Sequence, residues 1–182
     1  MRVLGVDPGT RVTGYGVIET GGGNGTPGIG RLIECGVFRF GRNNSLPHRL
    51  AELHHEIAQL IQRHHPAVLA LEDAFYHKNV RTTLVLGHAR GVILLAAQQQ
   101  GLDIAQYPPA TVKKTVVGAG GAQKSQVAAM VARLLRLKHA PKPADAADGV
   151  AVALTFILRS PSHRSPAPER RGGQGVRTGV RT

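Results

Sequence analysis

Residues Val3 to Thr10 read VLGVDPGT, a run of strand-forming side chains that ends on a carboxylate and a tight turn. Pro8 restricts Asp7 to extended backbone, and Pro8-Gly9 predicts the centre of a type II turn. Asp7 should therefore stand at the carboxyl end of a buried strand, where open α/β sheets bind their ligands. Such an Asp either opens the turn or holds a metal ion, and this motif alone leaves both interpretations open.

The charge of the chain favours nucleic acid as its partner. Its 182 residues suffice for one well-buried domain, and 23 Lys and Arg against 11 Asp and Glu give a formal net charge of +12. No uninterrupted apolar run reaches the ~18 to 20 residues that span a bilayer, and the chain begins with a strand rather than a signal peptide. We therefore expect a cytoplasmic protein with no membrane partner. The single Cys35 excludes an intramolecular disulfide and is predicted to be a core thiol.

Hydrophobic periodicity predicts an α/β fold with a mixed sheet. Strands are expected over residues 3–7, 13–19, 32–40, 68–71 and 103–107, and helices over 47–65, 82–99, 112–117, 126–137 and 144–158. The first three strands form an antiparallel meander, and a crossover helix then lets the fourth strand run parallel to the first. Glu72 would end the fourth strand as Asp7 ends the first. We expect one domain over residues 1–159 and a basic, disordered tail over 160–182.

Several smaller features carry local predictions. Gly14 removes a side chain that would crowd whatever lies above the first turn, unless it marks a bulge. The helix over 82–99 is apolar on most sides, so either it packs between the sheet and a partner or it is a well-covered core helix. Ser125 is predicted to cap the helix that follows it. The adjacent histidines at 54–55 and 64–65 are predicted to lie on the surface.

Two further acids, Asp145 and Asp148, lie three residues apart near the start of the last predicted helix, so their side chains share one face. The helix dipole by itself favours acids in a first turn. Against that explanation, the residues around them are Ala and Gly, which lets this helix end press against a sheet. With Asp7 and Glu72 they supply the four carboxylates that two hard divalent cations need to activate a water for phosphodiester hydrolysis.

Five motifs, taken in order, carry a family resemblance. The segments VLGVDPGTRVTGYGVIE, LEDAF, GHARG, VKKTVVGAGGAQKSQV and DAADGVAVALT resemble the RuvC family of Holliday junction resolvases, from residue 1 to about residue 158. The resemblance implies an RNase H-like mixed five-stranded sheet flanked by helices, a homodimer, and paired nicking of four-way junction DNA in recombination and repair. It places the catalytic, metal-binding acids on Asp7, Glu72, Asp145 and Asp148, with Mg²⁺, or Mn²⁺ in its place, as two ions per site. It also implies the branch-migration proteins RuvA and RuvB as partners.

The same resemblance assigns DNA contacts to Phe75, Lys113 and Lys124. Phe75 follows Glu72 by three residues and could wedge beside a base at the junction centre, although a core aromatic would look the same in the sequence. Tyr76 is a weaker candidate for the same wedge. The two lysines flank a Gly-rich loop, which is a suitable place for phosphate contacts. The basic strip is extended by Lys78, Arg81 and Lys114.

Two other functions compete with a junction endonuclease. DPGT followed by a glycine-bearing hairpin also resembles the phosphate loop of actin-like sugar and acetate kinases, but those folds need two such domains and 182 residues are too few. The other is a basic nucleic-acid-binding module without metal, against which the presence of all four acids argues. Asp7→Asn should abolish cutting and spare junction binding in a metal-dependent nuclease, whereas it should leave a binding module unchanged.

Overall fold

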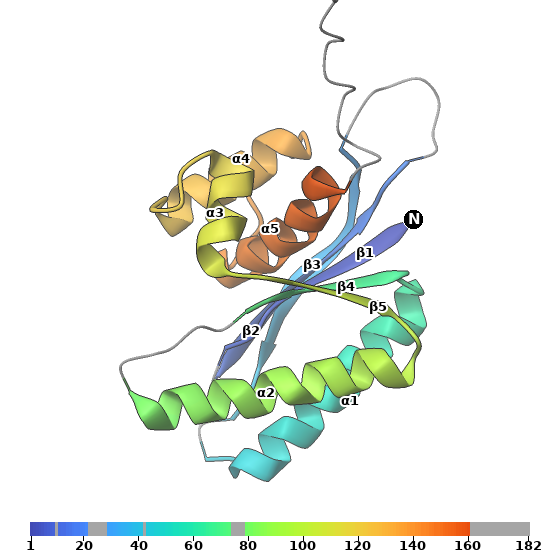
Figure 1. The fold of residues 1–182 in the computed structure, drawn as a ribbon, viewed down its shortest axis with the longest axis vertical. Helices are drawn as coiled ribbons and strands as arrows, with labels where there is room; N and C mark the ends of the chain where they lie inside the picture. The colour runs from blue at the N-terminus through green and yellow to red at the C-terminus, as the bar shows by residue number, and fades with distance from the viewer. Residues whose placement is uncertain (10, 22–28, 42, 74–78, 161–182) are drawn as a thin grey trace, which may run out of the picture.

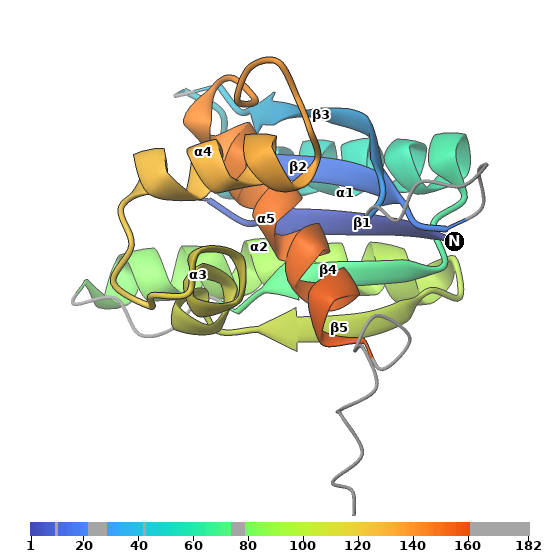
Figure 2. The same cartoon turned by 90° about the horizontal axis from the view of Figure 1, so that it is seen from above.

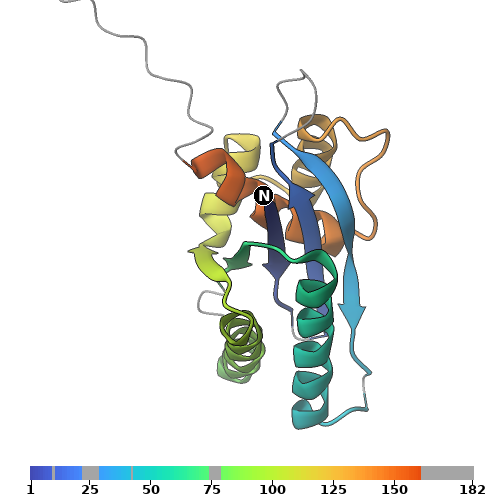
Figure 3. The same ribbon diagram turned by 90° about the vertical axis from the view of Figure 1, so that its right-hand side faces the viewer.

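A five-stranded mixed sheet separates two layers of helices (Figure 1). The computed structural model describes residues 1–9, 11–21, 29–41, 43–73 and 79–160. Its strands are β1 (Arg2–Asp7), β2 (Val12–Glu19), β3 (Arg31–Arg39), β4 (Val68–Glu72) and β5 (Asp103–Tyr107). Its helices are α1 (Leu46–His64), α2 (Val80–Gln99), α3 (Pro109–Val117), α4 (Lys124–Leu134) and α5 (Ala144–Arg159). Helices α1 and α2 cover one face of the sheet, and α3, α4 and α5 cover the other (Figure 3).

The connectivity of the sheet brings two strand ends together. The strand order is β3-β2-β1-β4-β5. Strands β1, β2 and β3 form an antiparallel meander, whereas β4 runs parallel to β1, and β5 parallel to β4. Val6 pairs with Leu71, so Asp7 and Glu72 follow at the same edge of neighbouring strands. The predicted mixed sheet, with its first and fourth strands side by side, is confirmed.

Helix α5 packs directly on β1 and β2 because glycines remove the intervening side chains. Seen from above, it crosses the strands obliquely (Figure 2). A Cβ on Gly14 would lie 1.8 Å from the carbonyl oxygen of Asp145, and a Cβ on Gly149 would lie 2.5 Å from the Cα of Tyr15. The predicted role of Gly14 is therefore confirmed, and the element above it is the start of α5. This close approach sets the two acids of α5 beside the end of β1.

Helix α2 has one buried face and one uncovered face. Ile93 and Ala97 are fully buried in the core that α2 shares with α1, β1 and β4. On the outer face the residues Val80, Leu84 and Leu95 are 65%, 59% and 52% exposed. The prediction of a well-covered core helix is thus wrong for the part of the chain that the structure describes. By length and composition alone α2 could also cross a membrane, but its inner face belongs to the core of the domain.

Two predictions about side-chain burial need correction. His64 is buried rather than on the surface, and its Nε2 lies 2.7 Å from an oxygen of Glu34 on β3. Neighbouring helical residues point about 100° apart, so only one member of the pair at the end of α1 faces the sheet, while His65 stays exposed. Cys35 on β3 is half-buried and packs at the margin of the core, since β3 is an edge strand.

The start of α4 also differs from the prediction. The helix begins at Lys124, and Gln123 rather than Ser125 is its N-cap. The backbone N–H of Gln123 donates to the side-chain oxygen of Gln126 at 2.8 Å, which completes a capping box. This reciprocal pair satisfies the first turn without a hydroxyl, and it brings Lys124 to the very start of the helix.

Candidate functional site

Asp7 and Glu72 lie side by side because they end two parallel, adjacent strands. The turn after Asp7 is not of type II, since the backbone of Gly9 lies outside the left-handed region that this turn requires. Glycine is needed there for space: a Cβ would lie 2.0 Å from the carbonyl oxygen of Val12. The chain thus folds tightly back into β2 and leaves the carboxylate of Asp7 at the open end of the sheet.

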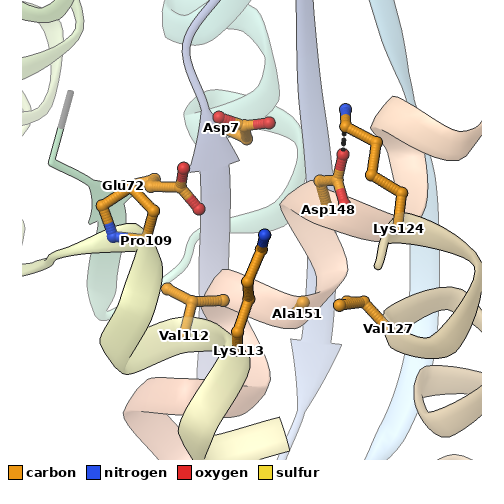
Figure 4. Close-up of a pocket in the computed structure, with 9 residues that line it drawn as sticks. All are labelled: Asp7, Glu72, Pro109, Val112, Lys113, Lys124, Val127, Asp148 and Ala151. Carbon is orange, nitrogen blue, oxygen red and sulfur yellow. Dashed lines mark hydrogen bonds and ion pairs between the residues drawn. The ribbon is translucent and has the colours of Figure 1, made fainter. Parts of the chain in front are cut away.

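A pocket of ≈ 220 Å³ gathers most of the predicted site residues (Figure 4). Asp7 stands at the tip of β1, Glu72 lies on one side of it, and Asp148 on α5 lies on the other. Lys113 on α3 and Lys124 on α4 also line the pocket, with their ammonium groups near the acids. Its remaining lining residues are apolar: Pro109, Val112, Val127 and Ala151. Several elements therefore converge on one group of charges above an apolar floor.

Lys124 joins the two acids of α5. Its Nζ lies 2.7 Å from an oxygen of Asp148 and 3.1 Å from an oxygen of Asp145. Although burial by itself lowers the pKa of this ammonium, the hydrogen bonds to Asp148 and Asp145 raise it above its ordinary value. The side chain of Asp148 is 14% exposed, whereas that of Asp145 is 39% exposed and lies at the rim. The two acids share one cation, as their spacing in the sequence suggested.

The buried acids carry more negative charge than their surroundings stabilise. Burial, and after it the charge of Asp148, raises the pKa of Asp7 to about 7. Burial, followed by the charges of Asp7 and Asp148, raises the pKa of Glu72 to about 8. Lys113 and Lys124 act in the opposite direction on Glu72 without cancelling these effects. A site of this kind favours the entry of additional positive charge.

The donor set of the pocket fits a hard divalent cation. It consists of carboxylate oxygens, which are the ligands that Mg²⁺ and Mn²⁺ prefer. In the present side-chain positions, no three His, Cys, Asp or Glu residues of the described chain lie close enough together to hold one ion. The ammonium of Lys124 instead bridges two of the four acids. The chemistry and charge of the acids thus suit a metal ion, while coordination requires their side chains to move from these positions.

An anchor for Glu72 was not predicted from the sequence. The next residue, Asp73, donates its backbone N–H to the carbonyl of Tyr107 at 2.8 Å, and its carboxylate lies 2.9 Å from the guanidinium of Arg90 on α2. Arg90 also bonds to Gln106 on β5. These contacts fix the chain just after Glu72 from two sides. The available signal in the sequence was Arg90 in the middle of a largely apolar helix, where a charged side chain needs an acceptor.

The predicted DNA contacts are only partly assembled around the pocket. Lys113 and Lys124 lie in it, whereas Lys114 is exposed on α3 and does not line it. Arg81 is exposed in the first turn of α2, which covers the other face of the sheet. The remaining three candidates lie outside the described residues: Phe75, Tyr76 and Lys78.

A mixed sheet with acids at the ends of two parallel strands, completed by acids on a helix that crosses them, defines an RNase H-like nuclease. Comparison with known proteins identifies the family to which this nuclease belongs. The family model for the crossover junction endodeoxyribonuclease RuvC matches residues 3–156. A RuvC from Azorhizobium caulinodans is 46% identical over 171 residues, covering 94% of this chain and 95% of its own. The structure of Thermus thermophilus RuvC superposes with a TM-score of 0.77 at 33% identity, covering 87% of this chain and 94% of that one.

The same protein has been solved in complex with a Holliday junction substrate, and that structure matches at a TM-score of 0.75 and 30% identity over the same shares of both chains. This chain belongs to the RuvC family of crossover junction endodeoxyribonucleases. It is thus a nuclease of the Holliday junction resolvase class, and the family match excludes the phosphotransferase alternative.

Proposed function

We propose that this protein resolves four-way DNA junctions by symmetric paired nicks, through metal-dependent hydrolysis at the pocket between β1, β4 and α5. The observation that carries the proposal is the convergence of Asp7, Glu72 and Asp148 on one pocket, with Asp145 joined to it through Lys124. The family relationship supports it, because the related Thermus thermophilus protein was solved with a junction substrate.

In this proposal Asp7, Glu72, Asp145 and Asp148 are the catalytic acids and hold two Mg²⁺ ions, for which Mn²⁺ substitutes. Bound in this way, the ions supply an activated water and stabilise the leaving oxygen. The apolar floor of the pocket keeps bulk water away from the inner acids Asp7, Glu72 and Asp148, which strengthens the charge interactions among them. Lys113 and Lys124 present ammonium groups to a phosphate that enters from the open side. The site needs no protein nucleophile.

Paired nicks require two sites, and the uncovered face of α2 supports a homodimer. Val80, Leu84 and Leu95 leave an apolar stripe on this helix, and a Cβ at Gly87 or Gly91 would meet nothing within 4 Å. Two copies of α2 could therefore approach closely along the glycine side. A four-way junction has two-fold symmetry, which a two-fold dimer would match.

The wider setting of the proposed reaction rests on the family. It comprises homologous recombination and DNA repair in the cytoplasm, with RuvA and RuvB as partner proteins and no membrane. Phe75 and Tyr76 are proposed to wedge beside a base at the junction centre, and Lys78, Arg81 and Lys114 to contact DNA. The nuclease domain over residues 1–159 and a basic tail over 160–182 complete the proposal.

Cleavage of a labelled synthetic four-way junction tests the proposed function. Wild type should make paired nicks in Mg²⁺ and in Mn²⁺, none in EDTA, and none in a linear duplex of the same sequence. Asp7→Asn should abolish nicking and leave junction binding largely intact. Asp103→Asn, at the opposite end of the sheet, removes an exposed carboxylate and should cut like wild type. Tight junction binding by wild type without nicks in either metal would favour a binding module instead.

A further inference from the structure

The edge strand β3 ends on an arginine that shares a face of the sheet with the acids. Arg39 pairs with Val12 on β2, and directly opposite residues of antiparallel strands project to the same face. Val12 alternates with Gly14, which faces α5 and pairs with Asp7. Arg39 and Asp7 therefore lie at the same end of the sheet and on the same side of it, two strands apart.

The distance between them suits two phosphates that lie a few nucleotides apart on one DNA strand. Two strand spacings give about 10 Å across the sheet, and two residues along β3 give about 7 Å, so the Cα of Arg39 lies ~12 Å from that of Asp7. Duplex DNA carries one charge per ~3.4 Å of axis on each strand. A backbone that passes over the acids would therefore reach Arg39 within a few nucleotides.

Arg39 is exposed, and the ion pairs found in the described chain do not include it. At the far end of the same strand, Arg31 lies 3.1 Å from Glu19. One more exposed cation, Lys142, lies just before α5, whose first turn passes over Gly14, the residue that pairs with Val37 on β3.

We propose that Arg39, with Lys142, forms a second phosphate-binding surface that holds junction DNA on the β3 side of the acids, opposite Lys113. We call these two residues the β3-side surface. The proposal rests on the proposed function, because it takes the acids as the point of cleavage. The positive charge of this surface lies next to the cluster of acids. It would therefore attract a polyanion that extends across the pocket. The surface would fix where the cleaved strand lies, while the acids would act on it.

Junction binding across a salt series tests the β3-side surface. The variants are Arg39→Gln and, as the matched control on the same strand, Arg31→Gln, each measured by fluorescence anisotropy in EDTA. Arg39→Gln should weaken binding about three- to tenfold, and should lower the slope of log K against log salt by about 0.9 for each phosphate that the variant no longer neutralises. Arg31→Gln should change affinity less than twofold, because its charge is already paired with Glu19.

The outcomes separate this inference from the proposed function. An unchanged slope for Arg39→Gln, or an equal loss for Arg31→Gln, would overturn the β3-side surface even if wild type nicks the junction. A lowered slope for Arg39→Gln alone would uphold it, and the nicking assay on the same junction would then judge the proposed function separately. Thermal melting of both variants confirms that each is folded, and Lys142→Gln provides a second variant with the same expected direction.

Discussion

Replacing Asp7 with Asn should stabilise the metal-free protein at pH 8, although it removes a predicted catalytic group. The carboxylate of Asp7 is buried beside Asp148, and these two effects raise its pKa from 3.8 to about 7. The folded state therefore binds a proton that the unfolded state releases. Below pH 4 the group is mostly protonated in both states, and its effect on stability is small. As the pH rises from about 4 through 7, the folded wild type loses stability, and Asn at this position has no such loss.

The size of the stability gain of Asp7→Asn follows from the size of the shift in the pKa of Asp7. About three pKa units at ~1.36 kcal/mol each give an upper limit of about 4 kcal/mol for the stabilisation of Asp7→Asn above pH 8. Because Asp7 shares its repulsion with Glu72 and Asp148, about half of that limit, ~2 kcal/mol, is the expected value. For a chain of this size the melting temperature should rise by roughly 4 to 8 °C.

Thermal unfolding in EDTA at pH 4, 6 and 8 measures this difference. The gap between Asp7→Asn and wild type should open as the pH rises. Asp103→Asn controls for the loss of one negative charge from a cationic chain, and should not show the same gain. Added Mg²⁺ should reverse the order, because a cation that binds only the folded wild type stabilises it. A variant less stable than wild type at pH 8 in EDTA, or a gap that does not change with pH, would refute the reasoning.

Three further predictions address the anchor, the dimer and the bridging lysine. Arg90→Met leaves Asp73 without its ion pair, so it should lower the free energy of unfolding by about 1 to 2 kcal/mol and slow junction cleavage about tenfold. Unchanged cleavage would exclude a role of Arg90 in positioning Glu72. Leu84→Glu should yield monomers in analytical ultracentrifugation with an unchanged melting temperature, whereas Ala51→Glu on the exposed side of α1 should not alter the oligomeric state. Lys124→Gln removes the ammonium that competes with a metal ion, so calorimetry without DNA should show several-fold tighter Mn²⁺ binding, and weaker binding would contradict that role.

Local sequence features were enough to predict how the sheet is built and where two of the acids lie. Alternating apolar residues defined the strands, and a crossover helix fixed the parallel pairing of β1 with β4. Asp7 and Glu72 follow from those two facts, because each is the residue at which a strand ends. The small residues around Asp148 similarly indicated that α5 presses on the sheet, and Gly14 is where it does so.

Contacts between distant parts of the chain could not be predicted in this way. The carbonyl of Val12 lies so close to Gly9 that no side chain would fit there, and the preference of Pro-Gly for a type II turn does not reveal this contact. Lys124 meets acids 21 and 24 residues further along, and a lysine beside a Gly-rich loop gives no sign of that pairing. The partner of Arg90 likewise depends on how α2 lies against β4 and β5. Such pairs appear only once the helices have been placed.

The distribution of charge explains how a protein of net charge +12 can keep an acidic pocket in its proposed DNA-binding face. Asp7, Glu72 and Asp148, if all ionised, would repel a phosphate at short range. The exposed cations at a distance, among them Arg39, attract the polyanion over a longer range. Within the pocket, burial makes unpaired negative charge unfavourable, so a bound cation reduces the repulsion among the acids. The same cation also reduces the repulsion between the acids and an incoming phosphate. Long-range attraction of DNA and binding of a phosphate in the pocket are therefore separate properties of the molecule. Substitutions on the β3-side surface should change the attraction of DNA, and substitutions of the acids should change the binding of the phosphate.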